Sequence, residues 1–284
     1  MREYQKRVNK LIQSLVSDIL DGKLTNKKAI NKALAKLSKD IGVPLNELKV
    51  RLATQAKDTS LEASHKIAKL LMAQNQDAVI KSMTADEVSI MVDKIFKGLL
   101  PFKKIKNGKT IDFAINVDDW FAYLGDDMVK KVKQGILGAY IDGSSPVEVA
   151  RNLLRNTELN SKANRAKIKA LTFTLVHKAN ETANLETFIK NERYIDWIKY
   201  QTAVDDRVDD VCEQAELESI QLKLKPTEYK EQRLAIPSLH VSCRCYIKAM
   251  TTMEDDSQEQ KINSLVRKHR RLANKNGYSK PRRK

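Results

Sequence analysis

"PSLHVSCRC", residues 237–245, contains two of the three cysteines and one of the four histidines in this 284-residue chain. The other residues of these two types are Cys212, His65, His177 and His269. Thiolates and imidazoles are the side chains that bind zinc and support redox chemistry. Their concentration in nine residues predicts a compact Cys/His module near the carboxyl end of the sequence.

The sequence before this module has the pattern of a helical protein. Only nine Gly and six Pro interrupt the chain, which suits long helices joined by short connections. Apolar residues at helical spacing predict helices over 4–20, about 26–41, 45–73, 84–99 and 161–191. The second of these is expected to be capped by Thr25 and stopped by "GVP" at 42–44.

Two capping boxes and one hairpin signal divide the helical part further. Thr84 with Glu87, and Ser145 with Glu148, have the spacing at which side chains cap a helix start reciprocally. The Asn-Gly pair in "FKKIKNGKTIDFAI" favours a β-hairpin, or else an exposed loop, after Pro101. His177 lies beside an apolar helical stripe and is assigned no chemistry.

The predicted fold class is mainly α: an elongated helical body, a small α+β Cys/His module and a basic tail. We expect a helical region over 1–100, a helical body over 101–193 and the module over 194–250, followed by an acidic linker and the tail over 251–284. Within the module, apolar alternation around 217–224 and in "CRCYIKA" predicts a small β-hairpin beside one or two helical turns.

The net charge of +16 comes largely from the carboxyl end. Residues 261–284 contain ten Lys or Arg and no Asp or Glu, and such a block favours non-specific binding to the phosphates of double-stranded DNA. A solvated tail that only keeps the protein soluble is the alternative. The cationic residues are Lys261, Arg267, Lys268, Arg270, Arg271, Lys275, Lys280, Arg282, Arg283 and Lys284.

Composition limits the remaining functions. No run of about 18 apolar residues predicts a membrane span, and the charged amino terminus does not resemble a secretory signal. Three cysteines are too few for a secreted disulfide scaffold, so we expect synthesis in a reducing cytoplasm. No P-loop, dinucleotide fingerprint or paired-carboxylate arrangement occurs, and the protein is predicted not to be an enzyme.

The cysteines and His240 form a candidate structural zinc site. His240 and Cys243 have knuckle spacing, and Cys212 supplies a third ligand from the preceding segment. Asp209 or Cys245 is the fourth candidate. Three alternatives stay open: a core of buried thiols around a hydrogen-bonded histidine, a catalytic Cys–His pair, and a zinc-dependent nucleic-acid-binding protein or nuclease with His240 as its base.

"YQTAVDDRVDDVC" followed by "IPSLHVSCRC" resembles the signature of the Mu F-like head morphogenesis family, the minor head proteins of tailed phages. The aromatic, Thr-Ala and Asp-Asp-Arg positions match in register, and so does "IPSLHVSCRC", residues 236–245, which we call the closing block. Asp209 stands where the family has its first cysteine. The resemblance covers about residues 135–250. The matching residues are Tyr200, Thr202, Asp205, Asp206, Arg207, Val208, Cys212, Pro237, Leu239, His240, Cys243, Arg244 and Cys245.

Membership of this family implies a nonenzymatic protein made in the host cytoplasm and located inside the virion head near the portal. There it would bind the portal protein, with scaffolding or major capsid protein as further partners, and aid head assembly, genome packaging or delivery. Asp205, Asp206 and Arg207 are expected to form a local ion-pair and capping network with Arg244, or else plain surface charge. A soluble DNA-binding regulator unrelated to virions is a further alternative.

Overall fold

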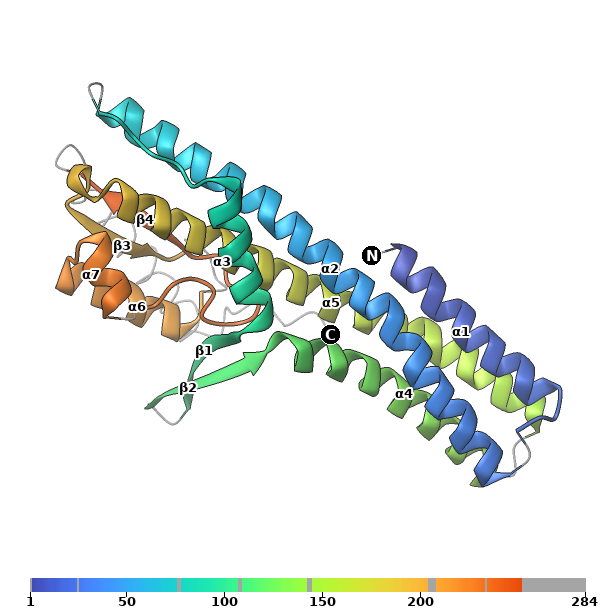
Figure 1. Ribbon diagram of the computed structural model, residues 1–284. Coiled ribbons are helices and arrows are strands. Elements are labelled where there is room, and N and C mark those ends of the chain that lie inside the picture. Colours follow the sequence, from blue (N-terminus) through green and yellow to red (C-terminus); the bar gives the residue numbers. More distant parts are fainter. Residues whose placement is uncertain are drawn as a thin grey trace. The chain divides into compact units, whose positions relative to one another are not determined.

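The computed structural model describes residues 2–24, 26–75, 78–106, 109–141, 145–203, 208–232 and 234–251. Within these residues the protein is mainly helical, as the sequence predicted, and has two small two-stranded sheets. Figure 1 labels the elements. In chain order they are α1 (Arg2–Leu20), α2 (Lys27–Gln74), α3 (Ala85–Lys97), β1 (Leu99–Lys106), β2 (Lys109–Asn116), α4 (Val117–Ile141), α5 (Pro146–Lys190), η1 (Glu192–Tyr194), β3 (Trp197–Gln201), α6 (Asp210–Leu222), α7 (Pro226–Glu231) and β4 (Tyr246–Met250).

The chain forms two compact units, each assembled from segments that are not consecutive. Unit 1 comprises the described residues of Met1–Asp58, Ser89–Pro101 and Phe113–Val176. Unit 2 comprises those of Thr59–Val88, Phe102–Asp112 and His177–Lys284. Both α2 and α5 contribute residues to each unit. The domain boundaries expected from the sequence stay a prediction.

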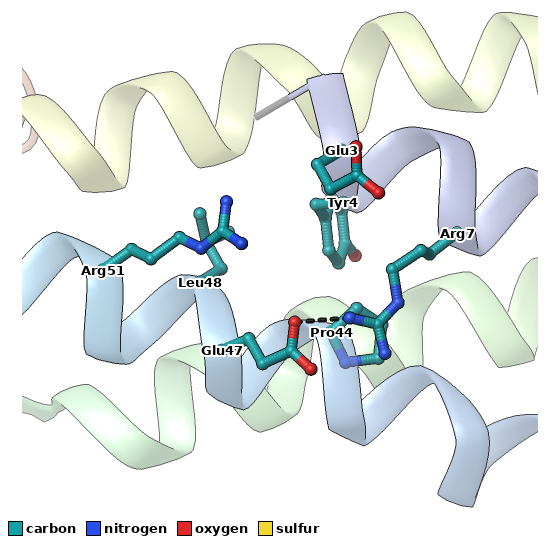
Figure 2. Close-up of a pocket in the computed structure, with 7 residues that line it drawn as sticks. All are labelled: Glu3, Tyr4, Arg7, Pro44, Glu47, Leu48 and Arg51. Carbon is teal, nitrogen blue, oxygen red and sulfur yellow. Dashed lines mark hydrogen bonds and ion pairs between the residues drawn. The ribbon is translucent and has the colours of Figure 1, made fainter.

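In unit 1, α1 packs on the first half of α2. Figure 2 shows Arg7 of α1 paired with Glu47 of α2 beside Tyr4 and Pro44. The small cavity at this point measures about 20 Å³, room for about one water. Apolar faces of the two helices supply the core here: Val8, Ile12, Leu15, Ile19, Ile30, Leu34, Leu37 and Ile41.

The helix α2 does not stop at "GVP", as we expected from the sequence. It continues without a break through Gly42 and Pro44 to Gln74. The apolar stripe explains the difference, because Ile41, Leu45 and Leu48 are all buried and keep helical spacing across the proline. Burial along this stripe outweighs the hydrogen bond that Pro44 removes.

Most of the expected helix starts are present, with one change of cap. Thr84 with Glu87, and Ser145 with Glu148, form the reciprocal bonds of capping boxes. For α2 the cap is Asn26, whose side-chain oxygen accepts from the backbone N–H of Ala29 at 2.9 Å. The predicted cap, Thr25, lies outside the described residues.

Strands β1 and β2 confirm the hairpin predicted after α3, although the Asn-Gly pair at its turn lies outside the described residues. Figure 1 shows β1 and β2 as a two-stranded ribbon. Leu100 and Phe102 of β1 are buried, whereas Ile111 and Phe113 of β2 are exposed. The backbone N–H of Lys103 donates to the carbonyl of Leu239 at 2.9 Å, which ties the ribbon to the closing block.

The predicted hairpin inside the Cys/His module is wrong in its connection. Strands β3 and β4 do pair antiparallel, with Tyr200 opposite Ile247, but two helices separate them in sequence. Residues 217–222, whose apolar alternation predicted a strand, belong to α6. Their period was misjudged because a six-residue apolar pattern fits either element.

Unit 2 has an apolar core under this small sheet. Phe188 of α5, Ile198 of β3, Tyr229 of α7 and Ile247 of β4 are all buried in it. The sheet therefore has one face packed against helices, which gives the segments around the cysteines a fixed support. No helix in the described ranges is both long and apolar enough to cross a membrane.

Candidate metal centre

Cys212 is placed by the start of α6. Asp209 is the N-cap, and its carboxylate accepts from the backbone N–H of Val211 at 3.2 Å. The cap fixes the first helical turn, which turns Cys212 inward, where its side chain is fully buried. The residues of this turn thus aim one thiol into the module.

His240 and Cys243 are placed by a tight turn in the closing block. The backbone N–H of Cys243 donates to the carbonyl of His240 at 3.2 Å, and Ser242 has a φ of 62°. A left-handed residue permits this sharp reversal. The turn therefore brings the two ligand side chains of the predicted knuckle together.

These two elements meet at one point. The ligand atoms of Cys212, His240 and Cys243 all lie within 4.8 Å of one another, so the group could hold a metal ion. The Sγ atoms of Cys212 and Cys243 are 3.7 Å apart. In a tetrahedral zinc site with Zn–S bonds of about 2.3 Å, two sulfurs lie about 3.8 Å apart. The spacing fits the tetrahedral edge.

Cys245 lies beside this group. Its thiol is buried, and it lies close enough to Cys212 to contribute to the raised pKa of that thiol. None of the three cysteines is in a disulfide. Neither Cys245 nor Asp209 is part of the three-residue group, but Asp209 is exposed and caps α6. Cys245 is therefore the better placed of the two candidates for a fourth ligand.

Tyr200 of β3 completes the surroundings of the sulfurs. Its hydroxyl donates to Sγ of Cys212 at 3.3 Å and lies 3.7 Å from Sγ of Cys243. Hydrogen bonds of this kind orient metal-binding ligands. Burial, followed by the nearby thiols, raises the pKa of Tyr200 far above its usual range, which keeps the phenol a donor.

The two thiols of the group and His240 all have shifted pKa values. Hydrogen bonds from Cys212, Cys245 and His240 hold the pKa of Cys243 well below its ordinary value. The same contacts and burial raise the pKa of Cys212. Burial lowers the pKa of His240, but its bond and attraction to Cys243 outweigh this, so the net pKa is raised. Negative charge thus concentrates on Cys243, as a cation site requires.

One face of α5 fixes the backbone of the closing block through three polar side chains, of which His177 is half-buried and Lys178 and Glu181 are buried. Nε2 of His177 lies 2.6 Å from the carbonyl oxygen of Cys245. Lys178 donates to the carbonyl of Ile236 at 2.6 Å. Glu181 accepts from the N–H of Ile247 at 2.8 Å. These contacts hold both ends of the segment that carries His240, Cys243 and Cys245.

Burial sets the protonation of this face. It lowers the pKa of His177, lowers that of Lys178 to about 8, and raises that of Glu181 to about 7. The sequence prediction gave His177 no role and missed the other two residues. The available signal was three polar residues within one turn, beside the buried positions Ala179 and Ala183.

The remaining predicted residues differ in outcome. Thr202 is buried and donates to Glu216 at 2.6 Å, Pro237 is buried, and Arg244 is half-buried. Asp205, Asp206 and Arg207, with their expected ion-pair network, lie outside the described residues. So does the basic tail from Lys261 to Lys284.

Comparison with known proteins gives no relative. No protein-family model matches the chain, and no curated protein or solved structure matches it. The resemblance to phage minor head proteins therefore rests on the two sequence blocks alone.

Proposed function

We propose that this chain is a minor head protein of a tailed bacteriophage, a nonenzymatic component that binds the portal inside the capsid. The observation that carries the proposal is the meeting of Cys212 with His240 and Cys243. These residues come from the two separate blocks that resemble the family signature. Blocks that belong to one motif are expected to form one site, and this supports reading them together.

We further propose that the site binds zinc in a structural role, through Cys212, His240, Cys243 and Cys245. Three thiols and an imidazole are a ligand set of structural zinc centres. The bound ion would supply folding free energy by joining α6 to the closing block. A catalytic zinc needs a free coordination position, and the buried thiol of Cys245 beside the group argues against one here.

The basic tail is the proposed contact with DNA. Its ten cationic residues and lack of carboxylates support binding to phosphates without sequence preference. A regulator that recognises one DNA sequence would instead show a specificity ratio of about 10³ or more between its site and other DNA. A filter-binding assay with unrelated duplexes distinguishes the two, since equal affinities support the tail.

The virion role is tested by mass spectrometry of purified phage particles made by the strain that carries this gene. We expect the chain in mature particles at low copy, and recovered with the portal protein after mild disruption. Its absence from particles, with normal expression in the cell, would overturn the proposal.

The zinc role has a separate test. Metal analysis of the purified protein should give one zinc per chain that survives mild chelation, without plasmid cleavage. Metal-dependent cleavage that His240→Ala abolishes would instead establish the nuclease alternative.

A further inference from the structure

The net positive charge of this protein comes from two parts of the sequence. Residues 40–260 contain 32 Lys or Arg and 33 Asp or Glu, so they are nearly neutral. Besides the tail, the excess lies in residues 1–39, which contain ten Lys or Arg and three Asp or Glu. This second basic region belongs to α1 and the start of α2, in unit 1.

Four lysines of α2 form a continuous line on its surface, which we call the lysine stripe: Lys28, Lys32, Lys36 and Lys39. Their spacing of four, four and three residues puts them on one helical face, and all four are exposed. The opposite face carries the buried core residues Ile30, Leu34 and Leu37. At about 1.5 Å per residue the stripe is about 16 Å long.

The stripe is not neutralised within the described part of the chain. Other lysines of unit 1 pair with carboxylates: Lys23 with Asp18 and Asp21, and Lys57 with Asp93. No ion pair joins a stripe lysine to a described carboxylate, and the sequence has no acid between residues 22 and 39. Like charges one turn apart repel by about 0.2–0.5 kcal/mol per pair, a cost that an anionic partner would reverse.

We propose that the lysine stripe binds the phosphate backbone of double-stranded DNA, as a second contact surface that is independent of the tail. A row of ammonium groups at about 6 Å intervals faces a polyanion with one charge per about 1.7 Å of helix axis. The charges are complementary, and the stripe spans the rise of about five base pairs.

The residues between the lysines favour DNA over a lipid surface. The other exposed residues from 28 to 39 are Asn31, Ala35 and Ser38, which are small and uncharged. No large apolar side chain is exposed there, because the apolar face of α2 is buried in unit 1. Amphipathic helices that bind membranes insert such a face. The stripe can only make surface electrostatic contact, which suits a phosphate backbone.

The test compares two full-length variants with equal loss of charge. The stripe variant replaces Lys28, Lys32, Lys36 and Lys39 by Gln, and the control replaces Lys69, Lys94, Lys97 and Lys133, which are also exposed. Binding to a mixed-sequence duplex of about 30 base pairs is measured from 50 to 200 mM salt. If four phosphate contacts are lost, the slope of log K against log salt becomes shallower by about 3 to 4.

We expect the salt slope of the stripe variant to be shallower than that of the unchanged protein by about 3 to 4. The control variant should keep most of the original slope. Lys→Arg at the four stripe positions should restore the original slope. Equal slopes for stripe variant and control would overturn the inference. The inference would also be overturned if the stripe variant lost binding to phosphatidylserine vesicles but still bound DNA as tightly as the unchanged protein. A third variant, with the nine cations from Arg267 to Lys284 replaced by Gln, reports the tail separately. Failure of the stripe and failure of the tail are thus distinguishable, and neither depends on zinc or on the virion role.

Discussion

The thiol of Cys245 and the carboxylate of Asp209 are the two candidates for the fourth position beside Cys212, His240 and Cys243. We expect Cys245→Ser to lower zinc content or to raise the zinc dissociation constant at least tenfold, because a hydroxyl is a poor zinc ligand. Asp209→Asn should leave zinc content unchanged, since Asn caps a helix about as well as Asp. Metal analysis after dialysis against a competing chelator measures both.

A second variant at Asp209 separates its role as a helix cap from a role as a zinc ligand. Asp209→Ala removes the cap as well as the charge, and should cost about 1 kcal/mol of unfolding free energy with zinc still bound. Loss of zinc in Asp209→Asn, with Cys245→Ser unaffected, would show that the carboxylate is the ligand and that the cap role of Asp209 is secondary.

Glu181 makes stability depend on pH. Burial raises the pKa of its carboxyl to about 7 from an ordinary 4.5. Between these values the native state keeps a proton that the unfolded chain releases, so stability falls as pH rises from about 4.5 to 7. The loss is at most about 3 to 4 kcal/mol, at about 1.36 kcal/mol per pH unit. Lys178, Asn184, Cys243 and Ile247 face this carboxyl.

Glu181→Gln should remove this part of the pH dependence. The amide oxygen still accepts from the N–H of Ile247, and no charge is buried at neutral pH. Urea unfolding of both proteins at pH 5, 6 and 7 measures the difference, and the shared metal site cancels in the comparison. A difference that is constant with pH would contradict the assigned shift.

At the scale of elements, α2 contains a glycine that the helix does not need. An added Cβ at Gly42 meets nothing within 4 Å, whereas at Gly98 it would lie 2.6 Å from the carbonyl oxygen of Lys94. Gly42→Ala should therefore stabilise the protein by about 0.5–1 kcal/mol. Gly98→Ala should destabilise it, because backbone must move. Urea unfolding ranks the two, and a destabilised Gly42→Ala would argue against a continuous α2.

Element types were predictable where local signals agreed. The capping boxes at Thr84 and Ser145 and the hairpin after Pro101 needed only neighbouring residues, and all three were predicted. The continuity of α2 through Pro44 was not, because it depends on the burial of Ile41 and Leu45, which pack beside Gly125 of α4. For the site, His240 and Cys243 were predicted from spacing. The roles of His177, Lys178 and Glu181 were not, because their partners are backbone carbonyls and N–H groups of a distant segment, which a run of polar residues on one helical turn does not identify.

At the scale of the whole molecule, the two units differ in what holds them together. The described part of unit 1 is a packing of helices with apolar stripes, and the candidate metal site lies wholly in unit 2. The chain has two tryptophans, Trp120 in α4 and Trp197 in β3. They fall in unit 1 and unit 2 respectively, so each can report on one unit.

Metal removal should separate the two signals. In Trp120→Phe the remaining Trp197 fluorescence should report unfolding at lower urea after chelation. A ligand at 100 times its dissociation constant contributes about 2.7 kcal/mol of stability, which chelation would remove. In Trp197→Phe the Trp120 signal should unfold as before. Because α2 and α5 contribute to both units, strong coupling through these helices is the competing outcome. Equal shifts of both signals would show one cooperative unit and contradict a metal effect confined to unit 2.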